Sequence, residues 1–349
     1  MATRTAKIGI LTGGGDCPGL NAVIRAVVKR ATVTYDMEVL GIREGWKGLV
    51  TGTVEPLTNY SVTGILPRGG TILGTSRTNP YKSQEDIQRL RDNLKRYGLH
   101  ALIAVGGEDT LGVAYRLFHD YRVNVVGVPK TIDNDLPGTD FTFGFDTAVH
   151  IATEAIDRLH TTAESHYRIM VVEVMGRHAG WIATFAGLSG GADCILIPEK
   201  PLSIEEAADI IKKRHQKGKT FSIVVVSEGF IPEGMDITYE KDTLSDEFGH
   251  VRLGGIGNII GRKLQDLTGI DTRVTILGHI QRGGTPTSHD RILATRFGVG
   301  AVDMIHRNEF GNMAALVGRS IVPVPLSELA RGTKPVDMEL YEIAEIFFR

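Results

Sequence analysis

The chain has 349 residues, a length that suits two domains or one large α/β unit. Its formal charge of −2 gives no overall field favouring nucleic acid or an anionic membrane, and no apolar stretch is long enough to span a bilayer. Two cysteines are too few for a disulfide framework or a four-cysteine zinc site, and the first residues lack the pattern of a signal peptide. We therefore expect a soluble cytoplasmic protein that binds neither nucleic acid nor membrane.

In chain order, short apolar runs alternate with amphipathic stretches. The runs are rich in β-branched residues and apolar on both faces, which is typical of strands buried in a parallel sheet. The predicted strands are 7–12, 38–43, 100–107, 123–129, 169–176, 194–198, 221–229 and 274–280. The predicted helices between them are 20–33, 85–97, 109–120, 146–163, 203–217, 254–268 and 288–307. This alternation predicts an α/β fold of two Rossmann-like, three-layer α/β/α lobes with mostly parallel sheets.

The two lobes are expected to share the chain in an interleaved way. No Pro- or Ser-rich linker separates the two blocks of strands and helices, so we expect the chain to cross between the lobes more than once. The polar segment 230–252 is interpreted as an inserted loop or short helix, and the tail as an amphipathic helix packed on the second lobe. The assigned ranges are 1–144 plus 281–334 for the first lobe and 145–280 plus 335–349 for the second.

Glycine is the one unusual count, because its 42 residues fall in clusters after the predicted strands. Glycine lets a backbone approach a ligand closely, and open α/β sheets bind ligands beyond the carboxyl ends of their strands. Six such loops carry charges together with glycine or proline: GGGD, GGEDT, PKTIDND, MGR, SEG and GHIQRGG. Since they follow strands of the same sheets, these loops predict one cleft or two facing ones.

Two of these loops open helices. In GGGDCPGLN, residues 13–21, three glycines would let backbone N–H groups face a phosphate at the helix N-terminus. The motif matches neither the GxGxxG nor the Walker A pattern, so a tight turn without a ligand is the alternative. In GGEDT, Glu108 and Asp109 are candidate Mg²⁺ ligands; the alternative, that Asp109 caps the helix and favours its dipole, is compatible with metal binding.

The loop TIDND, residues 131–135, places Asp133 and Asp135 on the same side of an extended segment. A carboxylate near a substrate hydroxyl can take its proton during phosphoryl transfer, and a second can orient metal or water. The alternative is an Asx-turn without a catalytic role.

Cationic residues recur at or near the same loops. Arginines in Gly-rich loops suit bidentate capture of phosphate, although any single one would be interpreted as a solvated surface charge. Six such arginines in a chain of net charge −2 indicate a site for phosphorylated ligands. For His279 the alternatives are a donor to a phosphate or sugar oxygen and a buried structural histidine. The set is Arg68, Arg77, Lys82, Arg168, Arg177, Arg273, His279 and Arg282.

In this order the motifs resemble those of the phosphofructokinase family, from residue 7 to about 307: TGGGDCPGLNAVIR, RGGTILGTSR, GGEDT, PKTIDND, SHYRIMVVEVMGRHAGW, SEG and GHIQRGGTPTSHDRILATR. The resemblance implies a homodimer or homotetramer that phosphorylates fructose 6-phosphate at its 1-hydroxyl, with Mg²⁺ as cofactor. It also implies that the first lobe binds the phosphoryl donor and the second lobe binds fructose 6-phosphate.

The resemblance also assigns roles to individual residues. Asp133 would take the proton of the 1-hydroxyl, Thr131 would contact the transferred phosphoryl group, and Asp135 would lie beside metal and sugar. Gly15 and Arg77 would stabilise the donor and the transition state. The donor would be bound by Gly14, Gly15, Arg77, Lys82, Glu108, Asp109, Thr110 and Lys130, and the metal by Glu108 and Asp109. The sugar phosphate would be bound by Met175, Gly176, Arg177, Glu228, His279 and Arg282, and by Arg168 and Arg273 of a neighbouring subunit.

Two positions depart from the pattern of ATP-using members, which typically read GGDGS and PGTIDND. Asp109 and Lys130 stand where those sequences have glycine, and in this the chain is similar to pyrophosphate-using members. A carboxylate at position 109 adds bulk and negative charge where the α-phosphate of a nucleotide would lie. The ammonium of Lys130 can neutralise the leaving phosphate of pyrophosphate. We therefore expect pyrophosphate as the donor and a reaction that runs in both directions.

Two alternatives stay open on the sequence. One is an ATP-dependent kinase of the same fold, since a lysine at position 130 alone also occurs in some ATP-using relatives. The other is a non-catalytic sugar-phosphate sensor, against which the retention of Asp133, Asp135, Arg77, Glu108 and Arg168 argues.

Overall fold

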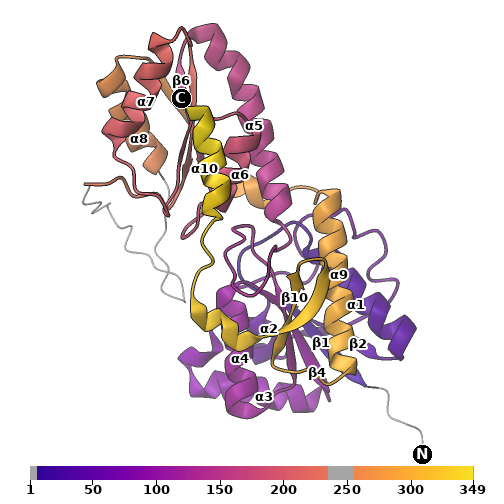
Figure 1. Ribbon diagram of the computed structural model, residues 1–349. Coiled ribbons are helices and arrows are strands. Elements are labelled where there is room, and N and C mark those ends of the chain that lie inside the picture. The colour runs from indigo at the N-terminus through magenta and orange to yellow at the C-terminus, as the bar shows by residue number, and fades with distance from the viewer. Residues whose placement is uncertain (1–5, 235–254, 349) are drawn as a thin grey trace, which may run out of the picture.

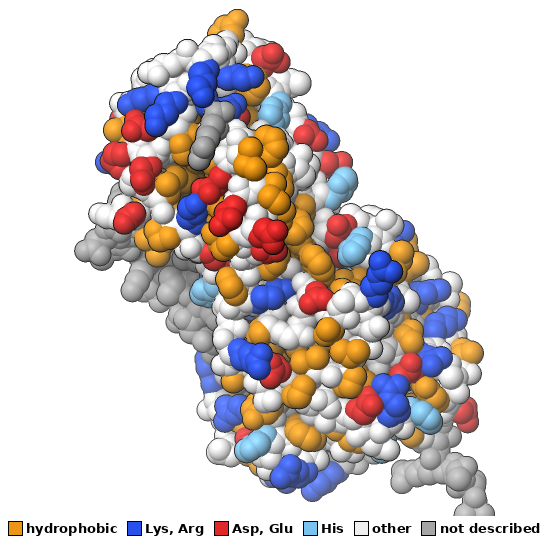
Figure 2. Space-filling model, in the orientation of Figure 1, with side chains coloured by type: hydrophobic (Ala, Val, Ile, Leu, Met, Phe, Trp, Pro, Cys, Tyr) orange, Lys and Arg blue, Asp and Glu red, His pale blue; other side chains and the backbone are white. Residues whose placement is uncertain are grey.

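The computed structural model describes residues 6–234 and 255–348 as two α/β bodies, each built on its own sheet (Figure 1). Strands run through the centre of each body and helices cover both faces, so each body has three layers. Acidic and basic side chains are mixed over the face shown in Figure 2, as expected for a formal charge of −2. No helix within the described ranges is long and apolar enough to cross a membrane.

The first sheet has seven strands in the order β11-β10-β5-β4-β1-β2-β3. Neighbours are parallel except at the two edges, where β3 pairs with β2 and β11 pairs with β10 in antiparallel fashion. In the centre, Ile10 of β1 lies opposite Ile103 of β4 and Gly41 of β2. The strands are β1 (Lys7–Thr12), β2 (Glu38–Ile42), β3 (Val54–Leu57), β4 (Ala101–Gly106), β5 (Val125–Pro129), β10 (Asn312–Val317) and β11 (Ser320–Pro325).

The helices of the first body form separate apolar cores on the two faces of this sheet. Successive residues of β4 point to opposite faces: Ile103 joins the core under α1 and α9, whereas Leu102 and Ala104 join the core under α2, α3 and α4. All six positions of β4 are therefore buried, as expected for a central parallel strand. The helices are α1 (Leu20–Tyr35), α2 (Trp46–Thr51), α3 (Gln84–Arg96), α4 (Glu108–Tyr121) and α9 (Ser288–His306).

The second sheet has four parallel strands in the order β7-β8-β6-β9. Val172 of β6 faces a core shared with α5 and α6, and Val171 faces a separate core under α7 and α8. The C-terminal α10 packs on this body, where Tyr341 donates its hydroxyl to the carbonyl oxygen of Ile195 at 2.7 Å. The elements are β6 (Ile169–Val174), β7 (Cys194–Leu196), β8 (Ser222–Ser227), β9 (Thr272–Ile276), α5 (Phe145–His166), α6 (Trp181–Ser189), α7 (Ile204–Gln216), α8 (Ile256–Thr268) and α10 (Met338–Glu345).

Within the described residues the chain passes between the two bodies three times. Residues 130–144 lead from β5 to α5, the 3₁₀ helix η2 (Gly278–Arg282) leads towards α9, and residues 332–337 lead from η3 (Leu326–Arg331) to α10. One apolar core runs through both bodies, from α1 and α9 to α5 and α6. The crossings therefore join two packed bodies.

The predicted α/β fold of two three-layer lobes is confirmed, and so is the helical tail. Each predicted strand and helix is present, although the strand predicted at 274–280 starts at Thr272 and gives way to η2 after Ile276. The sequence missed β3, which contains a proline, and the hairpin of β10 and β11 beyond the last motif. The helices α2 and α6 were not predicted either. The sequence of α6 is apolar on most sides and therefore shows no amphipathic period. The segment predicted as a loop or short helix at 230–252 lies mostly outside the described residues.

Candidate active site

The loops after β1, β4 and β5 meet those after β6 and in η2 around one cavity of about 160 Å³. The loops of each sheet come together because the carboxyl ends of parallel strands lie at one edge of the sheet. The lining is formed by Gly14, Gly15, Arg77, Gly107, Glu108, Asp109, Thr110, Lys130, Thr131, Asp133, Asp135, Arg177, His178 and Arg282. Five of the six predicted loops therefore line one cavity, and the sixth places Glu228 close enough to Asp133 for their charges to interact.

The segment after β5 is held as a turn by hydrogen bonds to the side chains of Thr131 and Asn134. The backbone N–H of Asp133 donates to Oγ1 of Thr131 at 3.1 Å, and Asn134 accepts from the backbone N–H of Thr142 at 3.0 Å. Asn134 has φ of 52°, in the left-handed region that asparagine tolerates better than most residues. The side chains of Asp133 and Asp135 line the cavity, and the carboxylate of Asp135 also accepts hydrogen bonds from Thr131 and from its own backbone N–H.

The pKa values of the two aspartates in the TIDND loop are raised by their surroundings. Burial raises the pKa of Asp133, although the cations of Arg282 and Arg177 oppose the shift. Burial, followed by repulsion from Asp133, raises the pKa of Asp135 to about 7. Oδ1 of Asp133 is buried and has no hydrogen-bond partner among the described residues. A buried carboxylate with raised pKa and an unused oxygen is a stronger base than an exposed one and has room to accept a proton.

Lys130 is a buried cation, only 3% exposed, at the end of β5. Its ammonium donates to the carbonyl oxygen of Gly15 at 2.6 Å, and burial lowers its pKa to about 8. Gly14 has φ of 77°, and a Cβ at this position would lie 3.5 Å from Nζ of Lys130. A Cβ at Gly15 would lie 2.9 Å from Nη1 of Arg282, so glycine lets this arginine approach the loop. Two cations thus flank a bare glycine backbone, which suits a phosphate.

The GGEDT segment forms the start of α4. The N-cap position is Gly107, so Asp109 lies in the first turn and the alternative that it caps the helix is wrong. Thr110 is buried against the glycines of the neighbouring strands, since a Cβ at Gly106 would lie 2.3 Å from its Cβ. This packing fixes the start of α4, with Glu108 and Asp109 in the cavity lining.

The residues fit Mg²⁺ bound together with phosphate. Within the described residues no three His, Cys, Asp or Glu side chains form a metal-binding group on their own. Four carboxylates nevertheless line the cavity, those of Glu108, Asp109, Asp133 and Asp135. Mg²⁺ usually keeps several waters and takes one or two carboxylates plus substrate phosphates, so a preformed protein cage is not required.

Other expected site residues lie behind the cavity or apart from it. Met175 is buried, and its N–H donates to Oε1 of Gln281 at 3.4 Å, while Gly176 accepts from Oγ of Ser227 at 2.6 Å. Lys82 and His279 are exposed and do not line the cavity, so the alternative of a buried structural histidine at 279 is wrong.

Arg168 and Arg273 lie at the far end of the second sheet. Both contact Asp271, at 2.5 Å and 2.6 Å. Met175 follows the opposite end of β6, which is roughly 20 Å away for a strand of six residues. Within one chain these two arginines therefore do not reach the cavity. His178 lines the cavity but was given no role from the sequence. Its position directly after Arg177 was the only feature of the sequence that indicated it.

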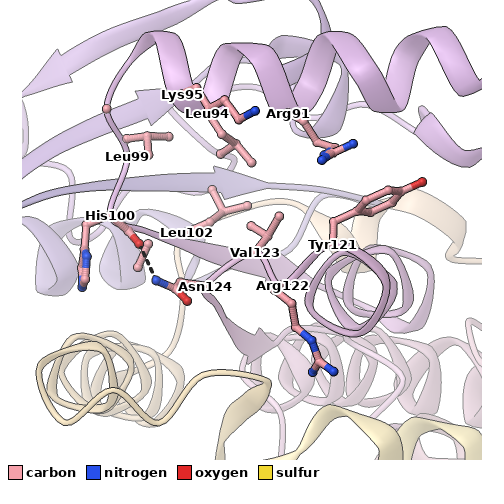
Figure 3. A pocket seen from close by; sticks show the side chains of 12 residues that line it. Arg91, Leu94, Lys95, Leu99, His100, Leu102, Tyr121, Arg122, Val123 and Asn124 are labelled. Atoms are coloured by element: carbon pink, nitrogen blue, oxygen red, sulfur yellow. Dashed lines mark hydrogen bonds between the residues drawn. The ribbon is translucent and has the colours of Figure 1, made fainter.

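A second cavity, of about 260 Å³, lies at the opposite edge of the first sheet (Figure 3). Its apolar middle is formed by residues such as Leu94 and Leu102, and Arg91 points towards Tyr121, 4.6 Å from the ring centroid. Lys95 in the last turn of α3 and Arg122 at the C-cap of α4 complement the helix dipoles. Its described lining includes no carboxylate, and His100 is a histidine without the acidic partners that line the first cavity.

The chain is similar to known proteins along nearly its whole length. A family model described as Phosphofructokinase matches residues 7–305. The chain is 56% identical over 342 residues to the pyrophosphate–fructose 6-phosphate 1-phosphotransferase of Streptomyces coelicolor, covering 98% of this chain and 99% of that protein. It is 50% identical over 339 residues to ATP-dependent 6-phosphofructokinase 3 of the same organism, covering 97% and 99%.

A solved structure is also similar to this chain. Phosphofructokinase of Pichia pastoris in the T-state matches with a TM-score of 0.80 at 33% identity, covering 99% of this chain and 37% of that one. The match in sequence and the match in structure thus extend over nearly the whole chain. The chain belongs to the phosphofructokinase family.

Proposed function

We propose that the protein catalyses the reversible phosphorylation of fructose 6-phosphate at its 1-hydroxyl by pyrophosphate, in the cytoplasm and with Mg²⁺ as cofactor. The products are fructose 1,6-bisphosphate and phosphate. The observation that carries the choice of donor is the presence of Asp109 and Lys130 in the lining of one cavity, beside the glycine loop after β1. The similarity to a pyrophosphate-using relative along nearly the whole chain supports the same choice.

Asp133 acts as the general base in this proposal. Its carboxylate takes the proton of the 1-hydroxyl while the sugar oxygen bonds to the terminal phosphorus of pyrophosphate and the bridging P–O bond breaks. The raised pKa of Asp133 and its unpartnered Oδ1 support this role. Thr131 contacts the transferred group, and Gly15 with Arg77 stabilises its charge. Mg²⁺ would be held by Glu108 and Asp109 and would neutralise phosphate charge.

Lys130 favours pyrophosphate by attraction, and Asp109 disfavours nucleotides by repulsion. The ammonium of Lys130 stays largely charged at neutral pH, because its pKa is about 8, and it binds the leaving phosphate. Asp109 repels the α-phosphate that a nucleotide would bring to the same place. The remaining donor contacts come from Gly14, Lys82, Glu108 and Thr110.

The sugar phosphate lies on the side of the second body, which would make residues 145–280 plus 335–349 the sugar lobe and 1–144 plus 281–334 the donor lobe. Met175, Gly176, Arg177 and Glu228 hold the sugar, and His279 with Arg282 binds its 6-phosphate. Arg168 and Arg273 lie too far from the cavity of their own chain, so we assign them to the site of a neighbouring subunit in a homo-oligomer.

The test of the donor assignment is Asp109→Gly, alone and with Lys130→Gly. If Asp109 excludes nucleotide, Asp109→Gly raises the ratio of kcat/KM for ATP over kcat/KM for pyrophosphate by about tenfold or more, and the double variant raises it further. Asp120→Gly at the other end of α4 is the matched control and leaves this ratio unchanged. An unchanged ratio in the Asp109 variants would favour the ATP-dependent alternative, for which the 50% identical relative is the precedent.

A further inference from the structure

The segment 332–337, which carries the chain from the first body to the second, is tied to both (Figure 1). The backbone N–H of Lys334 donates to the carbonyl oxygen of Asp135 at 2.8 Å. On the other side, the carbonyl oxygen of Lys334 accepts from Nε1 of Trp181, the first residue of α6, at 3.0 Å. Lys334 therefore touches both the end of the TIDND loop and the helix that follows the MGR loop.

The side chain of Lys334 adds a second layer of contacts. Its Nζ donates to the carbonyl oxygens of Thr139 and Asp140, both at 2.9 Å, and to Oδ1 of Asn134 at 3.3 Å. These contacts use all three protons of an ammonium group. Nζ also lies 4.9 Å from the centroid of the Trp181 ring, within the range of a cation–π contact. Lys334 thus binds the segment after β5 from outside the cavity.

The contact with Asn134 matters because this residue lies between the two aspartates. Its left-handed backbone, with φ of 52°, fixes how Asp133 and Asp135 are turned relative to each other. Oδ1 of Asn134 is held from one side by the N–H of Thr142 and from the other by Lys334. A conformation of this kind persists only when its surroundings over-determine it.

We propose that Lys334 is a positioning residue, which holds the loop carrying Asp133 and Asp135 in register with α6 and the preceding MGR loop. It is absent from the cavity lining and acts only through its neighbours. The inference rests on the proposed function, in that Asp133 is the group whose placement limits turnover.

The test replaces Lys334 by methionine, which keeps the length of the side chain, and by arginine, which keeps its charge. Lys334→Met lowers kcat by about 10-fold to 100-fold, because small misplacements of reacting groups cost this much, while KM for both substrates changes much less. Lys334→Arg restores most of kcat. Trp181→Phe keeps the aromatic ring but loses the bond to the Lys334 carbonyl oxygen, and lowers kcat less than Lys334→Met does.

Lys200→Met is the matched control. Lys200 also has an acceptor at 2.5 Å, in Glu345, and an aromatic ring at 5.3 Å, that of Tyr341, but it contacts no part of the TIDND loop. The Lys200→Met variant should lose thermal stability at most and keep the kcat of wild type. Equal kcat in Lys334→Met and wild type would overturn the proposal, and so would an equal loss of kcat in Lys200→Met. If Lys334→Met does not fold, Trp181→Phe is compared with Lys200→Met instead, and a kcat of Trp181→Phe equal to that of wild type overturns the proposal.

Amide hydrogen exchange separates this inference from the proposed function. Exchange in the peptide 131–142 is faster in Lys334→Met than in wild type or Lys200→Met, whatever the substrate of the enzyme. Faster exchange together with no activity towards fructose 6-phosphate in wild type would reject the proposed function and keep the positioning role. Unchanged exchange in an active enzyme would reject the positioning role alone.

Discussion

We predict that Lys130, which binds the phosphoryl donor, lowers the free energy of unfolding of the protein. Lys130 is buried, its ammonium donates a hydrogen bond to the carbonyl oxygen of Gly15, and burial lowers its pKa from 10.5 to about 8. Because the folded state binds this proton less well than the unfolded state, the lysine costs stability throughout the range below pH 8. The cost fades as pH rises from about 8 towards 10.5. Lys130→Met removes the cost together with the charge.

The magnitude follows from the same values. A pKa lowered from 10.5 to about 8 corresponds to about 3 kcal/mol of stability lost at pH 7. This net value already contains the attraction between Lys130 and nearby carboxylates, whereas the bond to Gly15, about 1 kcal/mol, is lost in addition. We therefore expect Lys130→Met to be more stable than wild type by about 1–2 kcal/mol at pH 7, and not at pH 10.

The assay is urea-induced unfolding of both proteins at pH 7 and pH 10, with Lys263→Met, at an exposed position of α8, as control. In parallel, Lys130→Met should lose about 10²-fold or more in kcat/KM for pyrophosphate, as expected when one partner of a buried charge contact is removed. A variant that is less stable than wild type at pH 7, or whose gain does not change with pH, would refute the reasoning about the buried charge.

Three further outcomes are expected. Asp133→Asn keeps the shape of the side chain but removes the base, so kcat should fall by about 10²-fold to 10⁴-fold with KM little changed in steady-state kinetics; a loss below tenfold would exclude this base. Burial raises the pKa of Glu228 from 4.5 to about 7, so the folded state loses stability as pH rises through this window. Glu228→Gln should therefore raise the melting temperature at pH 8 and not at pH 4.5, and a gain that is independent of pH would contradict this. Arg168→Ala and Asp133→Asn should each be nearly inactive, and mixed oligomers of the two should regain activity if sites are shared; no recovery on mixing would place Arg168 outside the site.

The strands at the centre of both sheets could be predicted because burial on two faces demands near-continuous apolar runs. HALIAV and FSIVVV are such runs, and β4 and β8 are buried at every position. The edge strands of the first sheet lack such runs. β3 contains Pro56, and β11 lies at the edge of the sheet beside β10 with none of its positions fully buried, so neither carries the signal of a central strand.

The loops of the site could be predicted because each follows a predicted strand, and parallel strands bring their carboxyl ends together. GGGD, GGEDT and PKTIDND therefore meet, as expected from β1, β4 and β5 being neighbours. What the sequence could not provide is contact between distant residues. The bond from Lys130 to Gly15 joins residues 115 positions apart, and that from Lys334 to Asn134 joins residues 200 apart. No local pattern marks either pair.

The most direct measurement of the central claim is a donor comparison on the unmodified protein with fructose 6-phosphate and Mg²⁺. Pyrophosphate should support turnover with a kcat/KM well above that for ATP or GTP. Fructose 1,6-bisphosphate with phosphate should return pyrophosphate, because the two phosphoryl bonds exchanged are closer in free energy than they are with ATP. Turnover with ATP and none with pyrophosphate in either direction would contradict the account.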